Sequence, residues 1–226
     1  MKSYEVGLRG EWATMSFTAS LFYSGWQDPQ IEGLTPSGNW YAVVNADSAE
    51  VLGFEVEANG ELAENLAYSL GYAHVDAQLA KNFEIPATGR PLVGVKGDRL
   101  PGVPKHSITA SIDWRQPGVI GEWDGNLNVN LYYRSNTWNN LPSTGRGATG
   151  GAVPSSVRMD GYALVNASDS LGNDKASVTL FVENLFESRG VGAVRQVTWG
   201  GDLLNASYGE YVARPRTIGL RTTWSL

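Results

Sequence analysis

The sequence is built from segments of about ten residues in which apolar and polar side chains alternate, as in strands that cross a membrane. The clearest segment is 14–21, where four apolar side chains alternate with Ser and Thr: Met15, Phe17, Ala19 and Leu21. Because successive side chains of a strand point to opposite faces, this segment has one apolar and one polar face. The pattern is typical of an outer-membrane β-barrel, whose apolar face contacts lipid and whose polar face lines a watery lumen.

Nine such strands are expected, at approximately 3–10, 13–26, 48–59, 66–77, 106–115, 125–136, 160–170, 176–187 and 212–226. The connections are short after the first, third, fifth and seventh strands and long after the second, fourth, sixth and eighth. Bacterial barrels have this asymmetry, with short periplasmic turns and long extracellular loops. The sequence therefore predicts an all-β, antiparallel transmembrane β-barrel fold.

Composition excludes several other classes. The formal net charge is −6 and no basic run occurs, so nucleic acid is not an expected partner. The chain has no cysteine, which excludes a disulfide scaffold and a thiolate metal site. No apolar run reaches the ~18–20 residues of a membrane helix, whereas a transmembrane strand needs only about 9–11.

A soluble β-sandwich would also alternate, and a soluble all-β binding module is therefore an alternative. Two features oppose it: the strict alternation of loop lengths, and aromatic residues at both ends of the strands. Outer-membrane barrels carry aromatic girdles at the two lipid–water interfaces. The expected girdle consists of Trp12, Trp114, Trp123 and Trp224 near the short turns, and Tyr23, Trp26 and Trp138 near the long loops.

An odd number of strands constrains the organisation further. Bacterial single-chain barrels have an even number, and nine strands leave two unpaired edges that lipid does not tolerate. We therefore expect residues 1–226 to be the C-terminal part of a larger barrel, with the first strands absent.

Several phrases, in order along the chain, resemble the C-terminal barrel region of TonB-dependent outer-membrane receptors of the siderophore-receptor type. They are 3–10 (SYEVGLRG), 21–23 (LFY) with 28–31 (DPQI), Asn45 and Ala49 with 53–57 (GFEVE), 100–106 (LPGVPKH), 180–186 (LFVENLF) and 214–220 (RPRTIGL). The resemblance covers essentially the whole chain.

The resemblance implies a barrel of about 22 strands around an N-terminal plug, of which this chain supplies the last nine. It implies outer-membrane localisation in a lipid bilayer and TonB-energised uptake of a scarce ligand, foremost a ferric siderophore, with no cofactor. Contact with TonB through the TonB box would belong to the missing N-terminal region. The barrel-assembly machinery would read the C-terminal strand, although family members usually end in Phe and this chain ends in Leu226.

Catalytic residues are not expected. His74 and His106 lie singly at strand ends, and Glu55 and Glu57 alternate with apolar residues, as on a solvated lumen wall. No convergent catalytic set and no metal-ligand spacing is visible, so an enzymatic barrel has the least support.

The candidate ligand-binding residues are aromatic and cationic side chains of the long loops, which suit anionic or aromatic ferric chelates. They are Trp40, Tyr41, Arg90, Arg99, Trp138, Arg146, Arg195 and Trp199, and Lys96 lies among them. The alternative is that these residues only cover the mouth of the barrel. A non-transporting structural barrel fragment is the remaining alternative for the whole chain.

Overall fold

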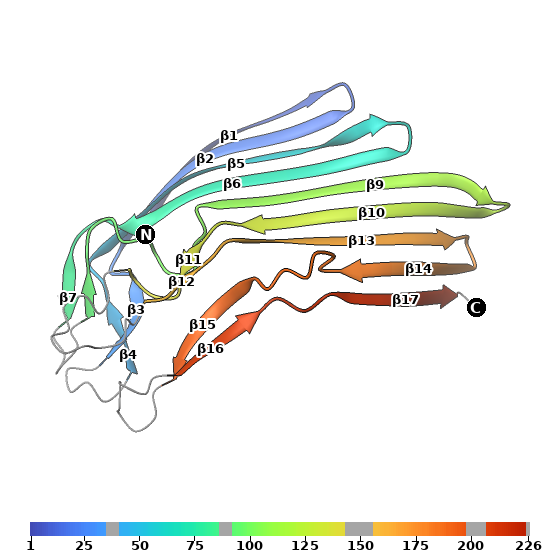
Figure 1. Ribbon diagram of the computed structural model, residues 1–226. Helices are drawn as coiled ribbons and strands as arrows, with labels where there is room; N and C mark the ends of the chain where they lie inside the picture. Colours follow the sequence, from blue (N-terminus) through green and yellow to red (C-terminus); the bar gives the residue numbers. More distant parts are fainter. Residues whose placement is uncertain (35–40, 86–91, 143–155, 198–206, 225–226) are drawn as a thin grey trace.

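A computed structural model describes residues 1–34, 41–85, 92–142, 156–197 and 207–224. Nine long strands form one antiparallel sheet in which neighbours in the chain are neighbours in the sheet (Figure 1). They are β1 (Lys2–Trp12), β2 (Met15–Gln27), β5 (Ser48–Ala63), β6 (Leu66–Leu79), β9 (His106–Ile120), β10 (Trp123–Arg134), β13 (Tyr162–Gly172), β14 (Ala176–Glu183) and β17 (Thr217–Trp224). The all-β antiparallel prediction and the count of nine long strands are confirmed.

The connections alternate in length as predicted. Residues 13–14, 64–65, 121–122 and 173–175 form tight turns at one end of the sheet. Tight hairpin turns require positive φ, which Asn65 (63°) and Gly121 (62°) adopt. In the last turn, the side-chain oxygen of Asn173 accepts hydrogen bonds from the backbone N–H groups of Lys175 and Ala176, both at 3.0 Å.

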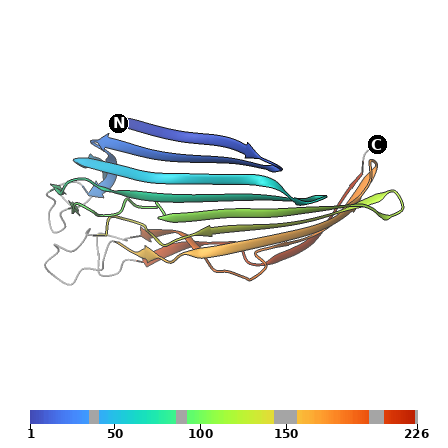
Figure 2. The same cartoon turned by 90° about the horizontal axis from the view of Figure 1, so that it is seen from above.

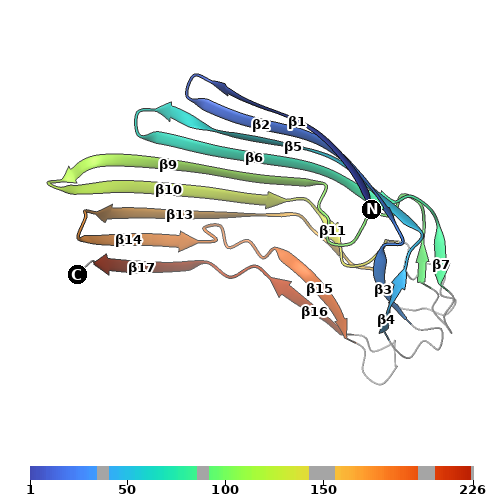
Figure 3. The ribbon, with the colours of Figure 1, turned by 180° about the vertical axis from the view of Figure 1, so that it is seen from behind.

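Each long connection carries a two-stranded hairpin of its own, which the sequence pattern did not predict. The hairpins lie at the end of the sheet opposite the tight turns (Figures 1 and 3). They pair β3 (Gln30–Leu34) with β4 (Tyr41–Asn45), β7 (Phe83–Ile85) with β8 (Leu92–Gly94), β11 (Thr137–Trp138) with β12 (Arg158–Met159), and β15 (Val191–Val197) with β16 (Ser207–Val212).

Cross-strand register aligns apolar residues from all nine strands on one face, whereas Phe22, Trp26 and Phe181 lie on the other. One row of directly paired residues crosses the entire sheet and consists of apolar residues and one glycine: Trp12, Met15, Gly60, Tyr68, Ile112, Val129, Ala167, Val182 and Ile218. Since a slip of one residue would turn a whole strand over, this match fixes the register.

The adjacent row of pairs belongs to the other face and is entirely polar across seven strands: Glu11, Ser16, Asn59, Ser69, Ser111, Asn130 and Asn166. Side chains along this face hydrogen-bond one another, as Asn166 Nδ2 does to Asn130 Oδ1 at 2.9 Å. Glu55 and Glu57 belong to the same face by alternation, as predicted. The two faces therefore have opposite solvent preferences.

The sheet is a single layer (Figure 2). In the described part of the chain no second sheet covers it, so the two packed sheets of a β-sandwich are absent. Apolar side chains of the sheet are consequently exposed, for example Trp12 at 76% and Leu220 at 66%. The sheet is open: β1 and β17 form its two edges, and neither pairs with a further strand among the described residues.

The strand β9 runs farther than the predicted 106–115. The pair Pro117-Gly118, which follows the predicted end of this strand, lies inside β9, because residues 117–119 form a bulge opposite Asp124. The Gly118 N–H donates to Asp124 Oδ1 at 2.8 Å, and Gly118 has a φ of 64°. A bulge tolerates proline because its residues do not contribute to the regular ladder.

The last two predicted strands were too long. β14 ends at Glu183, before residue 187, because Asn184 has a φ of 51° and turns the chain out of the sheet. β17 begins at Thr217, and Val212, the predicted start of that strand, ends the hairpin strand β16.

Candidate functional site

The hairpin end of the sheet contains the best-packed part of the described structure. Ala46, Ala49, Leu79 and Leu141 form a small buried core, and Phe83 and Leu100 pack against it. These residues come from three different long connections and the strands that bear them. The connections therefore share one apolar support.

Backbone hydrogen bonds and one ion pair join these connections. Ala80 N donates to Ser48 O at 3.0 Å across two connections, and Leu79 N donates to Asp98 O at 2.8 Å within the β6–β9 connection. Lys81 Nζ lies 3.0 Å from Asp47 Oδ1, and this contact with Lys81 lowers the pKa of the Asp47 carboxyl. The base of the loop region is thus ordered by specific contacts.

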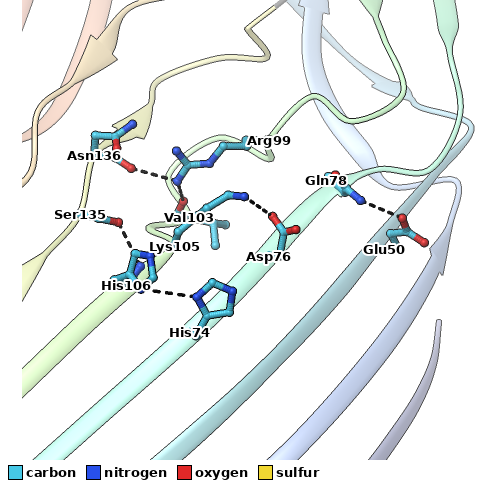
Figure 4. Close-up of polar contacts among 10 residues, drawn as sticks. All are labelled: Glu50, His74, Asp76, Gln78, Arg99, Val103, Lys105, His106, Ser135 and Asn136. Atoms are coloured by element: carbon cyan, nitrogen blue, oxygen red, sulfur yellow. Dashed lines mark hydrogen bonds and ion pairs between the residues drawn. The ribbon is translucent and has the colours of Figure 1, made fainter.

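Arg99 joins the β6–β9 connection to the segment after β10 (Figure 4). One of its terminal nitrogens donates to the backbone oxygens of Val103 at 3.1 Å and Asn136 at 3.0 Å. The Asn136 side-chain amide is assigned with its oxygen toward the arginines, where it accepts from Arg99 at 3.1 Å and from Arg158 Nε at 3.2 Å. One amide oxygen is therefore shared by two guanidinium groups.

The surroundings of Arg99 shift its pKa. Partial burial lowers the pKa, the Asp76 carboxylate opposes this change, and the adjacent Arg158 cation lowers the pKa further. Arg158 Nη2 also lies 3.9 Å from Asp160 Oδ1, so Asp76 and Asp160 balance part of the positive charge that these two arginines could offer to an anion.

A recess of about 370 Å³ lies between β12 and β15. Its lining carries both cationic and acidic groups, among them Arg158, Asp160, Tyr162, Arg189 and Glu210. Arg134 anchors the β15 hairpin next to it: the guanidinium donates to Val191 O at 2.7 Å and lies 4.9 Å from the centre of the Tyr162 ring. The recess therefore has a buried arginine behind one wall and an exposed arginine on its rim.

Comparison with known proteins decides the family. Residues 1–185 match the family model described as TonB dependent receptor-like, beta-barrel. The chain belongs to this family of receptor barrels. The resemblance recognised in the sequence is confirmed.

Individual relatives of the receptor barrel are similar at low identity. The probable TonB-dependent siderophore receptor PiuA of Acinetobacter baumannii is 24% identical, over 83% of this chain and 23% of that protein. The pesticin receptor of Yersinia pestis is 23% identical, over 97% of this chain and 28% of that protein. The chain thus spans about a quarter of the length of the curated relatives it matches.

Solved structures show the same fold. The ferric yersiniabactin uptake receptor FyuA of Yersinia pestis superposes with a TM-score of 0.70 at 20% identity, over 97% of this chain and 29% of that chain. The siderophore receptor PiuA of Acinetobacter baumannii gives a TM-score of 0.68 at 19% identity, over 97% of this chain and 27% of that chain. The nine long strands of this chain therefore match part of larger barrels.

Four of the eight predicted ligand-binding residues lie in described segments. Tyr41 begins β4, Trp138 ends β11 opposite Arg158, and Arg195 lies in β15 opposite Gly209. Arg99 and Trp138 belong to joined segments, because Gly102 N donates to Trp138 O at 2.8 Å. The other four lie outside the described residues: Trp40, Arg90, Arg146 and Trp199.

The predicted aromatic girdle divides into two groups. Register places Trp12, Trp114, Tyr23 and Trp224 on the apolar face, and Trp123 begins β10 beside the bulge. Trp26 alternates with Gly25 onto the polar face, where it pairs with Ala49, and Trp138 belongs to the β11 hairpin rather than to the sheet. Their position near a strand end suggested the girdle, but that position does not show whether a side chain belongs to the apolar face of the sheet.

Sequence reasoning missed Arg134, Arg158 and Tyr162, and it missed the pairing of the two histidines. Arg134 and Arg158 stand at the borders of predicted strands, where a charged residue carries no distinctive signal.

Within the described residues, no group of three or more His, Cys, Asp or Glu side chains could hold a metal ion, and no helix there is long and apolar enough to span a membrane.

Proposed function

We propose that the chain is part of an outer-membrane receptor barrel that takes up a ferric siderophore with energy from TonB. The observation that carries this proposal is the paired rows of the sheet, apolar across nine strands on one face and polar on the other. A single sheet with this division suits lipid on one side and water on the other. In soluble proteins, exposed apolar patches this extensive are rare.

The open edges support a larger barrel. β1 and β17 carry unpaired backbone groups along strands of 11 and 8 residues. In lipid each unpaired group costs several kcal/mol, so we infer that further strands cover both edges in the working receptor. The tight turns would then face the periplasm and the hairpins the exterior.

The expected ligand is an anionic iron chelate bound at the hairpin end. Arg99 and Arg158 share the Asn136 oxygen, and Arg158, Arg189 and Tyr162 line the recess. Guanidinium groups bind carboxylates and other anionic oxygens through paired, charge-assisted hydrogen bonds. Relatives named as siderophore, ferric yersiniabactin and ferric-catecholate receptors are in accord with this class of ligand.

The test is iron uptake in the source bacterium with the gene deleted. Uptake of ⁵⁵Fe is measured from three probes: a ferric catecholate, a ferric hydroxamate and ferric citrate. Deletion should abolish uptake of at least one probe, and a plasmid copy should restore it. Uptake equal to wild type for all three contradicts siderophore uptake and favours a non-transporting barrel.

Energy coupling is tested separately in the same cells. A protonophore or a tonB deletion should reduce the restored uptake to the level of the strain that lacks the receptor gene. Uptake that persists at the restored rate would contradict TonB energisation while leaving ligand recognition intact.

A further inference from the structure

His74 of β6 and His106 of β9 are direct cross-strand partners, at the last pair of the β6–β9 ladder. Their Nδ1 atoms lie 3.4 Å apart, and their ring centres are 4.8 Å apart (Figure 4). The phenol oxygen of Tyr72, on the same face of β6, lies 2.8 Å from His106 Nδ1. Three polar atoms therefore converge at one place on the apolar face.

Hydrogen bonding serves these three atoms unequally. A ring nitrogen offers either one proton or one lone pair. His106 Nδ1 faces both the Tyr72 phenol oxygen, at 2.8 Å, and His74 Nδ1, at 3.4 Å, so its one proton or lone pair serves the shorter contact and leaves the longer one weak. A cation placed between atoms that each hold a lone pair would satisfy all of them.

The separation of the two nitrogens matches a metal site. Zinc–imidazole bonds are about 2.0–2.1 Å long, so two nitrogens at corners of a tetrahedron lie about 3.3–3.4 Å apart. The observed Nδ1–Nδ1 distance is 3.4 Å. We propose that His74 and His106 bind a divalent transition-metal ion, Zn²⁺ or Cu²⁺. The Tyr72 oxygen, now at hydrogen-bond distance from His106 Nδ1, would become a third ligand by moving outward by about 0.5 Å. Imidazole suits both ions. Water would complete the coordination, because the partly exposed Asp76–Lys105 ion pair two residues along β6 places the site at the polar end of the apolar face.

The neighbours of the pair hold the rings in place. Phe54, directly across from His74 on β5, stacks on its ring with centres 5.5 Å apart and planes 29° apart. The Tyr72 ring stacks on the His106 ring with centres 6.2 Å apart. Because each imidazole ring is stacked on an aromatic neighbour, the two rings lose little conformational freedom when they bind a metal. Such preorganisation favours binding.

The charges beside the site are balanced. Asp76 lies two residues beyond His74 on the same strand, and its carboxylate is 2.8 Å from Lys105 Nζ (Figure 4). The N–H of His106 donates to Ser135 Oγ at 3.0 Å, which fixes the backbone of β9 at this point. Metal binding would thus cross-link β6 and β9 where their ladder ends and the connection bearing Arg99 begins. This inference does not depend on the proposed uptake function.

The first experiment uses Cu²⁺ alone with the wild-type protein, prepared without a histidine tag and purified in detergent. Residues 1–226 contain only these two histidines, and comparison with the His74→Gln/His106→Gln double variant shows which imidazole signals belong to the pair. Electron paramagnetic resonance should show one Cu²⁺ per chain with coupling to two imidazole nitrogens. A folded protein whose Cu²⁺ has only oxygen ligands, or one nitrogen ligand, would overturn the proposal.

The second experiment measures Zn²⁺ affinity by competition with a chromophoric chelator. His74→Gln and His106→Gln should each weaken binding more than about 10-fold, since even outer-shell changes cost 10–100-fold. Tyr72→Phe should weaken Zn²⁺ binding less. Tyr68→Phe, on the same face of β6 but four residues before Tyr72, should leave the Zn²⁺ affinity unchanged. Wild-type affinity in the folded His106→Gln protein would contradict the site. If one of the two histidine variants does not fold, the copper spectrum of the other decides, because it should lose one of the two imidazole nitrogens.

Discussion

Phe22 of β2 and Gly53 of β5 are direct cross-strand partners, and the phenyl ring occupies the space that a side chain at Gly53 would take. A Cβ at Gly53 would stand 2.4 Å from Phe22 Cζ and 2.6 Å from the backbone oxygen of His74. Phe181 and Gly219 repeat this relationship on the same face, with a Cβ-to-ring distance of 2.4 Å. An aromatic ring placed over a strand glycine covers exposed backbone and pins the register.

The close approach predicts that Gly53→Ala is destabilising. The ring could rotate away, but the His74 carbonyl belongs to the ladder and cannot, so we expect a cost of about 1–3 kcal/mol, as for other overpacked sites. Urea unfolding in detergent micelles measures it. Gly25→Ala is the control, because a Cβ there would meet nothing nearer than 3.6 Å. Equal unfolding midpoints for the two variants would contradict this reading of the pair.

Asn184 makes a second structural prediction. It is 4% exposed, its side-chain nitrogen donates to Ser188 O at 2.9 Å and Arg214 O at 2.7 Å, and its side-chain oxygen accepts from Ser188 N at 2.8 Å. Asn184→Gly keeps a residue that tolerates the φ of 51°, so its effect reports the lost hydrogen bonds. We expect a loss of about 2–4 kcal/mol of unfolding free energy, since buried backbone groups lose their partners.

The control for Asn184 is Asn59→Ala, an exposed asparagine on the polar face. That change should alter the unfolding free energy by less than about 0.5 kcal/mol. Hydrogen exchange adds a local readout: in Asn184→Gly, the amides of residues 184–190 and of residues 213, 214 and 216 should exchange faster than in wild type. Unchanged exchange there would show that Asn184 does not tie these segments together.

The sheet was predictable because its two faces differ in solvent. Alternation such as Phe17-Thr18-Ala19-Ser20 defines strand, face and register together, and tight turns follow from residues such as Asn65 and Gly121. The hairpins β3–β4 and β15–β16 were not predictable, because short strands of mixed composition lack a clear period. The extension of β9 through Pro117 was not predictable either, since a bulge removes the need for the backbone N–H that proline lacks.

The candidate site was less predictable than the fold. Arg99 was identified as a cation in a long loop, but its partners Val103 and Asn136 depend on how two connections meet. Arg158 comes close to Arg99 only because β11 pairs with β12, a pairing that places Arg158 opposite Trp138. His74 and His106 are 32 positions apart in the sequence, and only the β6–β9 register makes them neighbours.

Asp47 and Lys81 predict a pH dependence. The contact with Lys81 lowers the pKa of Asp47, so the folded protein holds its carboxylate charged more readily than the unfolded chain does. The stabilisation from this pair is therefore complete above the ordinary carboxyl pKa of about 3.9 and is lost as the pH falls through the lower, folded value. Because both groups are well exposed, the effect is small and salt-sensitive.

The measurement for Asp47 compares wild type with Asp47→Asn. Their urea midpoints should differ at neutral pH and converge as the pH falls below about 4. Lys81→Gln should behave like Asp47→Asn. A difference that grows on acidification would have the wrong sign and would contradict the assignment of the pair.

Arg158 and Arg99 should differ in what they contribute, and this prediction rests on the proposed uptake of an anionic iron chelate. The Arg158 side chain is 56% exposed, whereas Arg99 donates to two backbone oxygens. Arg158→Gln should therefore leave the unfolding free energy within about 0.5 kcal/mol of wild type and weaken binding of a ferric catecholate about 10-fold, the loss of one hydrogen bond to a charged group. Arg99→Gln should cost about 2 kcal/mol of stability and also weaken binding.

Calorimetric titration of the detergent-solubilised protein with the ferric catecholate measures binding, and urea unfolding measures stability. Arg115→Gln is the control, because Arg115 lies at the tight-turn end beside Asp113 and should change neither quantity. A receptor that binds the catecholate as tightly with Arg158→Gln as without it would exclude Arg158 from the ligand surface. Weakened binding with Arg115→Gln would instead indicate a nonspecific effect of net charge, since the two substitutions remove the same charge from opposite ends of the sheet.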